Sequence, residues 1–171
     1  MVYSKFGNTG AEVSKLGFGA MRLPMREEDG KKFVNEELAI PLIRRAFDLG
    51  VNYVDSAPYY CESQSEIAVG KALKGYRDKV YLSTKNSIKD PSGDSWMQRL
   101  EESLKKLDTD YIDFYHFWGI GLESFRSWQG LEYGPIEAAK KAKEQGLIKH
   151  LSFSYHDAAE NFKEIVDSGI Y

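Results

Sequence analysis

The chain has 171 residues, of which 42% are hydrophobic and 13% aromatic, enough for one sizeable core and too few for two ordinary domains. Its 23 basic residues nearly balance 26 acidic ones, and the formal charge of -3 is spread along the chain, which argues against nucleic-acid binding. A lone cysteine, Cys61, excludes an internal disulfide or all-cysteine metal cluster, and with no signal-peptide pattern or bilayer-length apolar run we expect a cytoplasmic protein.

A β-hairpin is predicted at the start, from short strands at residues 3–6 and 12–14 with glycine-rich turn residues between them. Leu16–Met21 then reads as an apolar strand that contains Gly17 and Gly19. Glycine within a strand marks either the close approach of a ligand or tight packing, and the spacing does not choose between the two.

Five helices are predicted from apolar residues at helical spacing, and most of them end at glycine. They are expected over Glu36–Leu49, from Ser63 or Ser65 to Gly75, from Ser95 through Leu107, over Ile136–Gln145 and over Asp157–Asp167. The inward positions are expected to include Leu38, Leu42, Ile43, Ala46, Phe47, Ile67, Ala68, Ala72, Leu73, Ala158, Phe162, Ile165 and Val166. Residues 24–35 and 119–130 are predicted to be loops.

Strands with apolar residues on both faces indicate a parallel sheet covered by helices. The five strands are predicted at Leu16–Met21, Asn52–Val54, Val80–Lys85, Tyr111–Trp118 and Ile148–Tyr155. An open doubly wound sheet and part of a (β/α)8 barrel both fit this α/β pattern. Polar or aromatic residues follow every strand, which favours the barrel, where functional groups gather at all the carboxyl ends of the strands.

The segment from Val51 to Lys85 organises the predicted site. Its strand–helix–strand pattern is a parallel crossover, so Asp55 and Lys85 should emerge side by side, with Tyr60 just beyond Asp55. A phenol, whose ordinary pKa is about 10, becomes a better acid beside a cation, and a carboxylate can hold that cation in place. The spacing alone equally allows a surface tyrosine next to a buried ion pair without catalysis.

Five motifs in register with the strand ends resemble the aldo-keto reductases. They are Lys5-Phe6-Gly7-Asn8-Thr9-Gly10, Leu16-Gly17-Phe18-Gly19, Asp55-x-Ala57-Pro58-x-Tyr60, Ser83-Thr84-Lys85 and Asp110-Tyr111-Ile112-Asp113. The run from Ala20 to Pro24 is most like bacterial members related to an iron–sulfur-containing branch. The resemblance implies a barrel of the (β/α)8 type, here about five βα units after an N-terminal hairpin, that uses NADPH or NADH to reduce an aldehyde or ketone.

Carried over by position, the resemblance implies that Tyr60 donates the proton and that Lys85 and Asp55 support it. It also implies a cofactor site. The cofactor-binding residues are expected to be Gly19, Ala20, Met21, Asp55, Ser154 and Tyr155.

Two positions depart from the family pattern. Where the family places its active-site histidine the chain has Trp118, which we expect to line the substrate pocket near Tyr60, because positions 114, 116 and 118 alternate onto one strand face. His116 is the remaining candidate for a catalytic histidine, but its position better suits a hydrogen-bonded interior residue. The asparagine that often follows the carboxamide-binding serine is replaced by Tyr155.

Three functions stay open at this stage: a carbonyl reductase or the N-terminal part of one, a truncated or regulatory module without catalysis, and a Schiff-base lyase that uses Lys85. Asp55 disfavours the lyase because it would keep the amine charged. Only five of eight repeats are present, so we expect free strand edges, self-association through them, and no appreciable turnover by this chain alone. We expect no nucleic-acid, membrane or metal partner.

Overall fold

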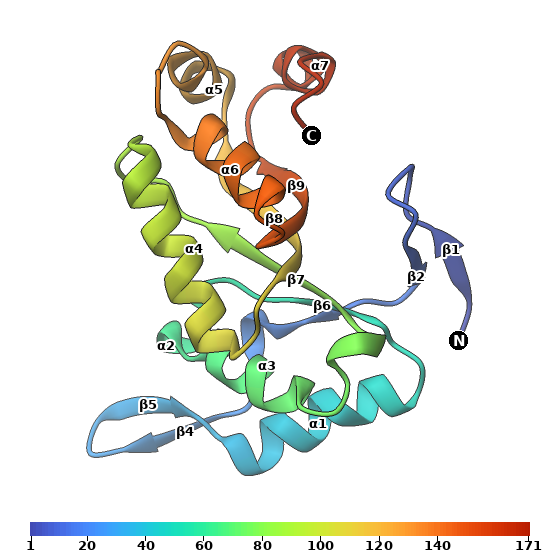
Figure 1. Ribbon diagram of the computed structural model, residues 1–171. Helices are drawn as coiled ribbons and strands as arrows, with labels where there is room; N and C mark the ends of the chain where they lie inside the picture. Colours follow the sequence, from blue (N-terminus) through green and yellow to red (C-terminus); the bar gives the residue numbers. More distant parts are fainter. The chain divides into compact units, whose positions relative to one another are not determined.

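Five strands are assigned to one sheet in the computed structural model, which describes residues 1–171 (Figure 1). The strands follow the order β3, β6, β7, β8, β9, and the pairs β3–β6, β6–β7 and β8–β9 run parallel. Helices alternate with these strands along the chain. The predicted α/β class, with five parallel strands after an N-terminal hairpin, is therefore confirmed.

The chain divides into two compact units, residues 1–84 with 103–109 and residues 85–102 with 110–171. The first contains β1 (Tyr3–Lys5), β2 (Glu12–Ser14), β3 (Phe18–Gly19), η1 (Ala20–Arg22), β4 (Met25–Glu28), β5 (Lys31–Val34), α1 (Glu36–Asp48), β6 (Tyr53–Asp55), α2 (Tyr60–Ser63), α3 (Ser65–Leu73) and η2 (Arg77–Lys79). The second contains β8 (Ile112–Ile120), α5 (Leu122–Gln129), α6 (Pro135–Glu144), β9 (Ile148–Tyr155) and α7 (Ala159–Asp167). Strand β7 (Tyr81–Asn86) and helix α4 (Gly93–Leu107) contribute residues to both. No helix is both long and apolar enough to cross a membrane.

The N-terminal hairpin, β1 with β2, is attached to the residue that precedes β6. The backbone N–H of Ser14 donates to Asn52 Oδ1 (2.7 Å), and Asn52 Nδ2 donates to the carbonyl of Glu12 (2.9 Å). The ring of Phe6 meets Tyr53 edge-on, with 5.8 Å between the centroids. The hairpin is thus fixed at the amino end of β6, and the carboxyl end with Asp55 is left for the site.

Helix α1 buries a narrower stripe than its sequence suggests. Ala39, Ile43 and Phe47 are buried at four-residue spacing, where α1 packs beside α3. Leu38 and Leu42, expected to point inward, are exposed, so the prediction is wrong for these two. A four-residue stripe turns only slowly around a helix, so it leaves the flanking leucines outside the contact with α3.

Helix α7 also buries a narrow stripe, whereas α3 is buried at seven of its nine residues. Ile67 of α3 is exposed, and so are Phe162 and Val166 of α7, although all three were expected inward. In α7 only Ile165 is buried, and Ala158 lies before the helix as its exposed N-cap residue.

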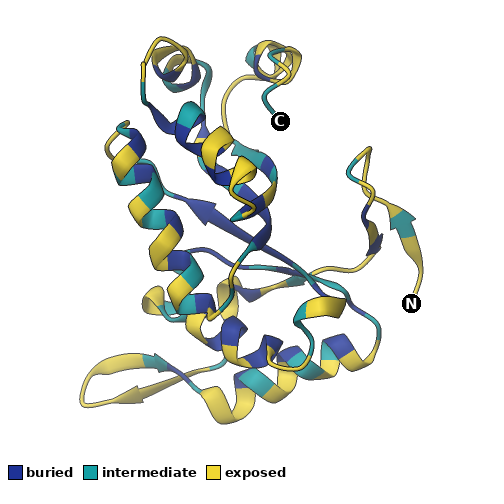
Figure 2. Cartoon of the chain, in the orientation of Figure 1, coloured by how far each residue is buried: buried dark blue, intermediate teal, exposed yellow.

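Residues 24–35, predicted to be a loop, form the hairpin β4–β5 instead. Met25 pairs with Val34 and Glu28 with Lys31 in an antiparallel register, around a two-residue turn. Asp29 and Gly30 take positive φ values of 52° and 73°, as the tight turn of such a hairpin requires. The hairpin projects beside the start of α1 and is largely exposed (Figures 1 and 2). Its polar side chains hide the alternation by which a strand is usually recognised.

Two further expectations are corrected. The strand expected over Leu16–Met21 is limited to Phe18–Gly19, because residues 20–22 turn into the 3-10 helix η1. The segment 119–130, expected to be a loop, contains α5, in which Phe125 and Trp128 are buried three residues apart. Its glycines had suggested a loop, but they flank the helix and do not interrupt it.

The core of the second unit is aromatic. Trp96 of α4 is fully buried and packs against Tyr115 and Phe117 of β8, at ring-centroid distances of 5.4 and 6.1 Å. Phe117 continues to Trp128 of α5 at 5.5 Å. Burial of each such side chain is worth about 1.5–3 kcal/mol, so this cluster holds α4 and α5 on β8.

Candidate active site

The carboxyl ends of β3 and β6 lie in register with each other and with the middle of β7. Gly19 pairs with Asp55, and Asp55 pairs with Ser83. Ser83 Oγ donates to Asp55 Oδ1 at 2.9 Å, and the N–H of Ser56 donates to the Ser83 carbonyl at 2.9 Å. The Asp55 carboxylate is therefore fixed at this strand end by its neighbour on β7.

A hydroxyl relay joins the turns that follow β3 and β6. Ser56 Oγ and Ser65 Oγ lie 2.8 Å apart, and Ser65 Oγ donates to the carbonyl of Ala20 at 2.8 Å. All three residues are buried. Buried polar groups that are fully paired specify one local arrangement, so this relay fixes where the Tyr60 segment leaves the sheet.

Tyr60 opens a left-handed turn. Cys61, Glu62 and Ser63 have φ values of 52°, 54° and 64°, although none of them is glycine. An L-residue in this region costs about 1–2 kcal/mol, so the turn persists only because other contacts hold it. The short element α2 is this turn, and α3 starts anew at Ser65.

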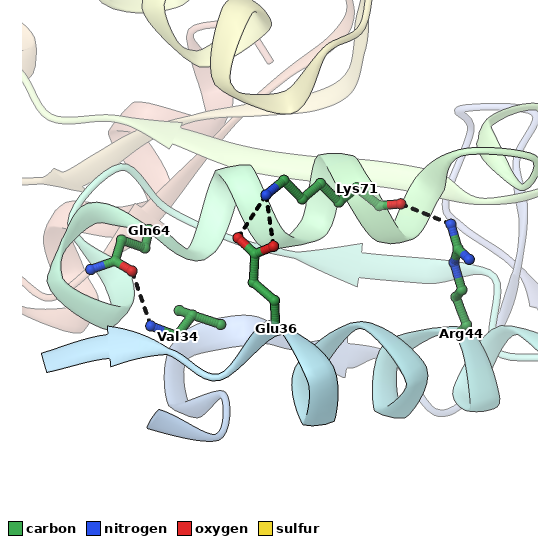
Figure 3. Close-up of polar contacts among 5 residues, drawn as sticks. All are labelled: Val34, Glu36, Arg44, Gln64 and Lys71. Carbon is green, nitrogen blue, oxygen red and sulfur yellow. Dashed lines mark hydrogen bonds and ion pairs between the residues drawn. The ribbon is translucent and has the colours of Figure 1, made fainter. Parts of the chain in front are cut away.

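Side chains of the turn bind the backbone of residues 20–34. Cys61 Sγ lies 3.4 Å from the N–H of Leu23, which donates to it, and 3.3 Å from the Met21 carbonyl. Gln64 Oε1 accepts from the N–H of Val34 (3.0 Å), and Gln64 Nε2 donates to the Lys32 carbonyl (3.1 Å). Figure 3 shows Gln64 reaching β5 at Val34, while the Glu36–Lys71 ion pair joins α1 to α3 further along.

The two glycines before the predicted cofactor segment's Ala20 and Met21 have different surroundings. A Cβ at nearby Gly17 would contact the Tyr53 ring at 3.6 Å, so that glycine serves packing. A Cβ at Gly19 would have no heavy atom within 4 Å. Ala20 is fully buried and Met21 is 55% exposed. Gly19, at the end of β3, therefore has open space beside it, and its register partner is Asp55 at the end of β6.

Lys85 begins the second unit and is only 8% exposed. Asp55 and Tyr60 belong to the first unit. The predicted meeting of Asp55, Tyr60 and Lys85 therefore stays a prediction.

His116 lies inside the pair β8–β9. Its register partner is Ser152, whose Oγ lies 2.7 Å from His116 Nδ1. The register breaks between Phe117 and Ile120, so Trp118 sits in a β-bulge. Strict alternation of side chains ends at such a bulge, and the direction of the Trp118 indole therefore does not follow from counting residues.

The side chains of Ser154 and Tyr155, at the end of β9, both form hydrogen bonds. Ser154 Oγ accepts from the N–H of Gly119 at 2.7 Å, so the serine closes the bulge. The Tyr155 hydroxyl donates to the Ala158 carbonyl. Partial burial raises the pKa of Tyr155, as do the carboxylates of Asp157 and Glu160.

Asp157 organises the turns after β8 and β9, a role the sequence analysis did not assign. Its Oδ2 accepts from the N–H of Leu122 (3.0 Å) and from Asn161 Nδ2 (3.1 Å), and its Oδ1 accepts from the N–H of Ala158 (2.7 Å). These bonds hold the pKa of Asp157 below its usual range, with Leu122 contributing most. An aspartate just before a helix, with a glutamate at position 160, was the available signal.

Gln64 is a second residue whose role the sequence pattern does not indicate. No local motif marks it, because its partners are backbone atoms of a hairpin that was itself predicted to be a loop.

Comparison with known proteins identifies the chain's relatives. Residues 15–170 match the model of the Aldo/keto reductase family. Aldo-keto reductase YhdN of Bacillus subtilis is 37% identical over 125 residues, which cover 67% of this chain and 37% of the relative.

Solved structures agree with the family match. The holo form of aldo-keto reductase AKR11C1 from Bacillus halodurans superposes with a TM-score of 0.80 at 30% identity, over 98% of this chain and 54% of that one. An aldo/keto reductase from Klebsiella pneumoniae, solved with NADP and acetate, has a TM-score of 0.71 at 25% identity, over 90% of this chain and 50% of that one. The chain thus spans about half the length of these enzymes. The matches do not support the likeness to the iron–sulfur branch.

Proposed function

This chain belongs to the aldo/keto reductase family, and on that premise we propose that it is a nicotinamide-dependent carbonyl reductase, or the N-terminal part of one. The substrate class is an aldehyde or a ketone. NADP(H) is the cofactor we favour, because the Klebsiella pneumoniae relative was solved with NADP. With its single free thiol, Cys61, we place the protein in a reducing cytoplasm.

The observation that carries the proposal is the arrangement at the ends of β3, β6 and β7. A fixed carboxylate, Asp55, lies in register with Gly19, beside which the surface is open. A flat ring can approach a backbone that has no side chain in its way. A nicotinamide held along Gly19, Ala20 and Met21 would fit there and would supply the hydride.

Each further residue has a role in the proposed reaction. Tyr60 gives its phenolic proton to the carbonyl oxygen as negative charge develops on it. Lys85, oriented by Asp55, supports that transfer with its positive charge. Ser154 and Tyr155 contribute to the cofactor site from the end of β9, Trp118 lines the substrate pocket, and His116 orients β8 through Ser152.

The reductase assay follows NADPH consumption with a simple aldehyde, using the natural protein that carries this sequence. Tyr60→Phe keeps the ring and removes the proton, so turnover should fall by about 10²–10⁴-fold. Tyr59→Phe is the matched control, because Tyr59 is the exposed neighbour, and it should stay near the parent rate. Equal rates for parent and Tyr60→Phe would reject Tyr60 as the donor. Trapping of the substrate on Lys85 by borohydride would instead establish a Schiff base.

A second candidate function is a module without catalysis, favoured by the partial coverage of the relatives, 37% of YhdN and 54% of AKR11C1. We infer that the 171-residue chain by itself self-associates through its strand edges and shows no appreciable turnover. Light scattering with an NADPH titration tests this. A monomer that reduces the aldehyde at an ordinary enzymatic rate would contradict it.

A further inference from the structure

The turn that carries Tyr60 is attached to the β4–β5 hairpin by one side-chain amide. Gln64 stands four residues after Tyr60, and its own N–H bonds to the carbonyls of Tyr60 (3.2 Å) and Cys61 (3.1 Å). Its side chain bonds to β5 at Lys32 and Val34. A displacement of the hairpin is therefore transmitted through one residue to the backbone of Tyr60.

The geometry of this amide is specific. The N–H of Val34 and the carbonyl of Lys32 lie two residues apart on one strand and face the same way, as the edge of a β-strand does. Gln64 presents an acceptor to the first and a donor to the second, so only one orientation of its amide satisfies both. The amide thus pairs with the free backbone edge of β5 in the way that a neighbouring strand would.

Packing beside this bond is incomplete. A pocket of about 430 Å³ opens beside Gln64, lined by Arg26, Phe33 and the first residues of α1. Hairpin side chains such as Glu28 and Lys31 are exposed and face solvent. Val34 at the base of the hairpin is buried, and the Gln64 side chain binds the hairpin backbone at this end.

The turn needs such support, because three consecutive residues after Tyr60 are left-handed without being glycine. Cys61 supplies a second attachment through Leu23 and Met21, and Ser65 a third through Ala20. Of these, only Gln64 reaches the hairpin. Without it the turn can relax while the strand ends stay in place.

We propose that Gln64 is a positioning residue for Tyr60, and that its amide makes the β4–β5 hairpin part of the structure that aims the phenol. This inference rests on the proposed function, in which Tyr60 donates the proton. The exposed hairpin has no catalytic group of its own. Through its backbone contacts with Gln64 it would nevertheless affect catalysis.

The test observes Tyr60 directly. Tyrosine labelled with ¹³C at Cζ gives one NMR signal for each of the 11 tyrosines, and Tyr60→Phe identifies the one from Tyr60. In Gln64→Ala, the Tyr60 signal should shift or broaden, and hydrogen exchange at the Val34 amide should rise about fivefold, as expected for one lost hydrogen bond. Lys71→Met removes an ion pair between α1 and α3 and should change neither.

Gln64→Glu keeps the test decisive if the alanine variant unfolds. At neutral pH the carboxylate still accepts from Val34 but repels the Lys32 carbonyl, so the Tyr60 signal should move. Below the ordinary glutamate pKa of about 4.3 the protonated side chain can again donate, and the parent signal should return. A merely structural role would not give this reversal.

An unchanged Tyr60 signal in folded Gln64→Ala, or in Gln64→Glu at neutral pH, would overturn the inference. The reductase assay is read separately. Absence of carbonyl reduction by the natural protein would contradict the proposed function, whereas the NMR result decides the positioning of Tyr60 in either case.

Discussion

The turn after β6 and the turns after β8 and β9 are held in place by different kinds of hydrogen-bonding groups. Around Tyr60, neutral groups bind the neighbouring backbone: the Gln64 amide, the Cys61 thiol and the Ser65 hydroxyl. After β8 and β9, the carboxylate of Asp157 bonds to the turns that follow both strands. The neutral groups around Tyr60 do not titrate in the acid range. Only the hydrogen bonds to the Asp157 carboxylate should therefore weaken as the pH falls.

The two regions also differ in how they accommodate positive φ. In the bulge of β8 the position with φ of 66° is Gly119, where the conformation costs little. In the Tyr60 turn three residues with side chains take it. Backbone strain is therefore found in the turn that carries Tyr60 and not in the bulge of β8. This is the pattern expected where a candidate catalytic residue is positioned at a cost in local stability.

The largest effect on stability is expected from Asp157→Ala. It removes three hydrogen bonds and leaves the N–H groups of Leu122 and Ala158 without their acceptor. Tm should fall clearly in a thermal melt at neutral pH. Glu160→Ala is the control, because it removes a nearby carboxylate that does not bridge the turns; an equal loss there would mean that charge alone, and not the bridge, stabilises this region.

The stability contributed by Asp157 should depend on pH, unlike that contributed by the neutral groups around Tyr60. The pKa of Asp157 is lowered in the folded protein, so its stabilisation is present above the unfolded pKa of about 3.9 and is lost as the pH falls through the folded value. The difference in Tm between parent and Asp157→Asn should shrink over that interval. A difference that stays constant down to the lowest pH would show that the carboxylate is not the stabilising species.

Gly119→Ala should cost about 1–2 kcal/mol, because alanine must take φ of 66°. Space does not limit it, since the nearest heavy atom would be 4.0 Å from the new Cβ. Urea denaturation measures the change, with Gly130→Ala as the control at ordinary φ. A loss no greater than that of the control would exclude conformational strain as the cause.

Ser63→Gly should have the smallest effect and the opposite sign. It relieves left-handed strain at an exposed residue, while the added freedom of glycine in the unfolded chain offsets part of the gain. We expect a stabilisation below about 1 kcal/mol in urea. Destabilisation would mean that the Ser63 side chain makes a contribution that outweighs its backbone strain.

The long apolar segments could be predicted because their own residues determine them. Strand Ile148–Tyr155 was predicted with the bounds it has, and α1 and α6 were placed within one residue. The hairpin β4–β5 could not be read in the same way, since five of its eight strand residues are charged. Only Asp29-Gly30 marked it, as a turn without recognisable strands around it.

The site was predictable to the extent that it lies at strand ends. The placement of Asp55 beside Gly19 and Ser83 follows from the parallel register. Gln64 was not predictable, because its partners are backbone atoms distant in sequence. Trp118 shows a third limit: its direction depends on a bulge, which arises from the pairing with β9 and not from local pattern.

The distance between Tyr60 Oη and Lys85 Nζ, in a crystal structure of the natural protein with NADPH, tests the proposed catalytic site most directly. We predict that the two atoms lie within hydrogen-bond reach, about 2.6–3.2 Å, or are joined by one water, with Asp55 next to the amine. A structure in which Lys85 extends into bulk solvent while Tyr60 is ordered elsewhere would contradict it.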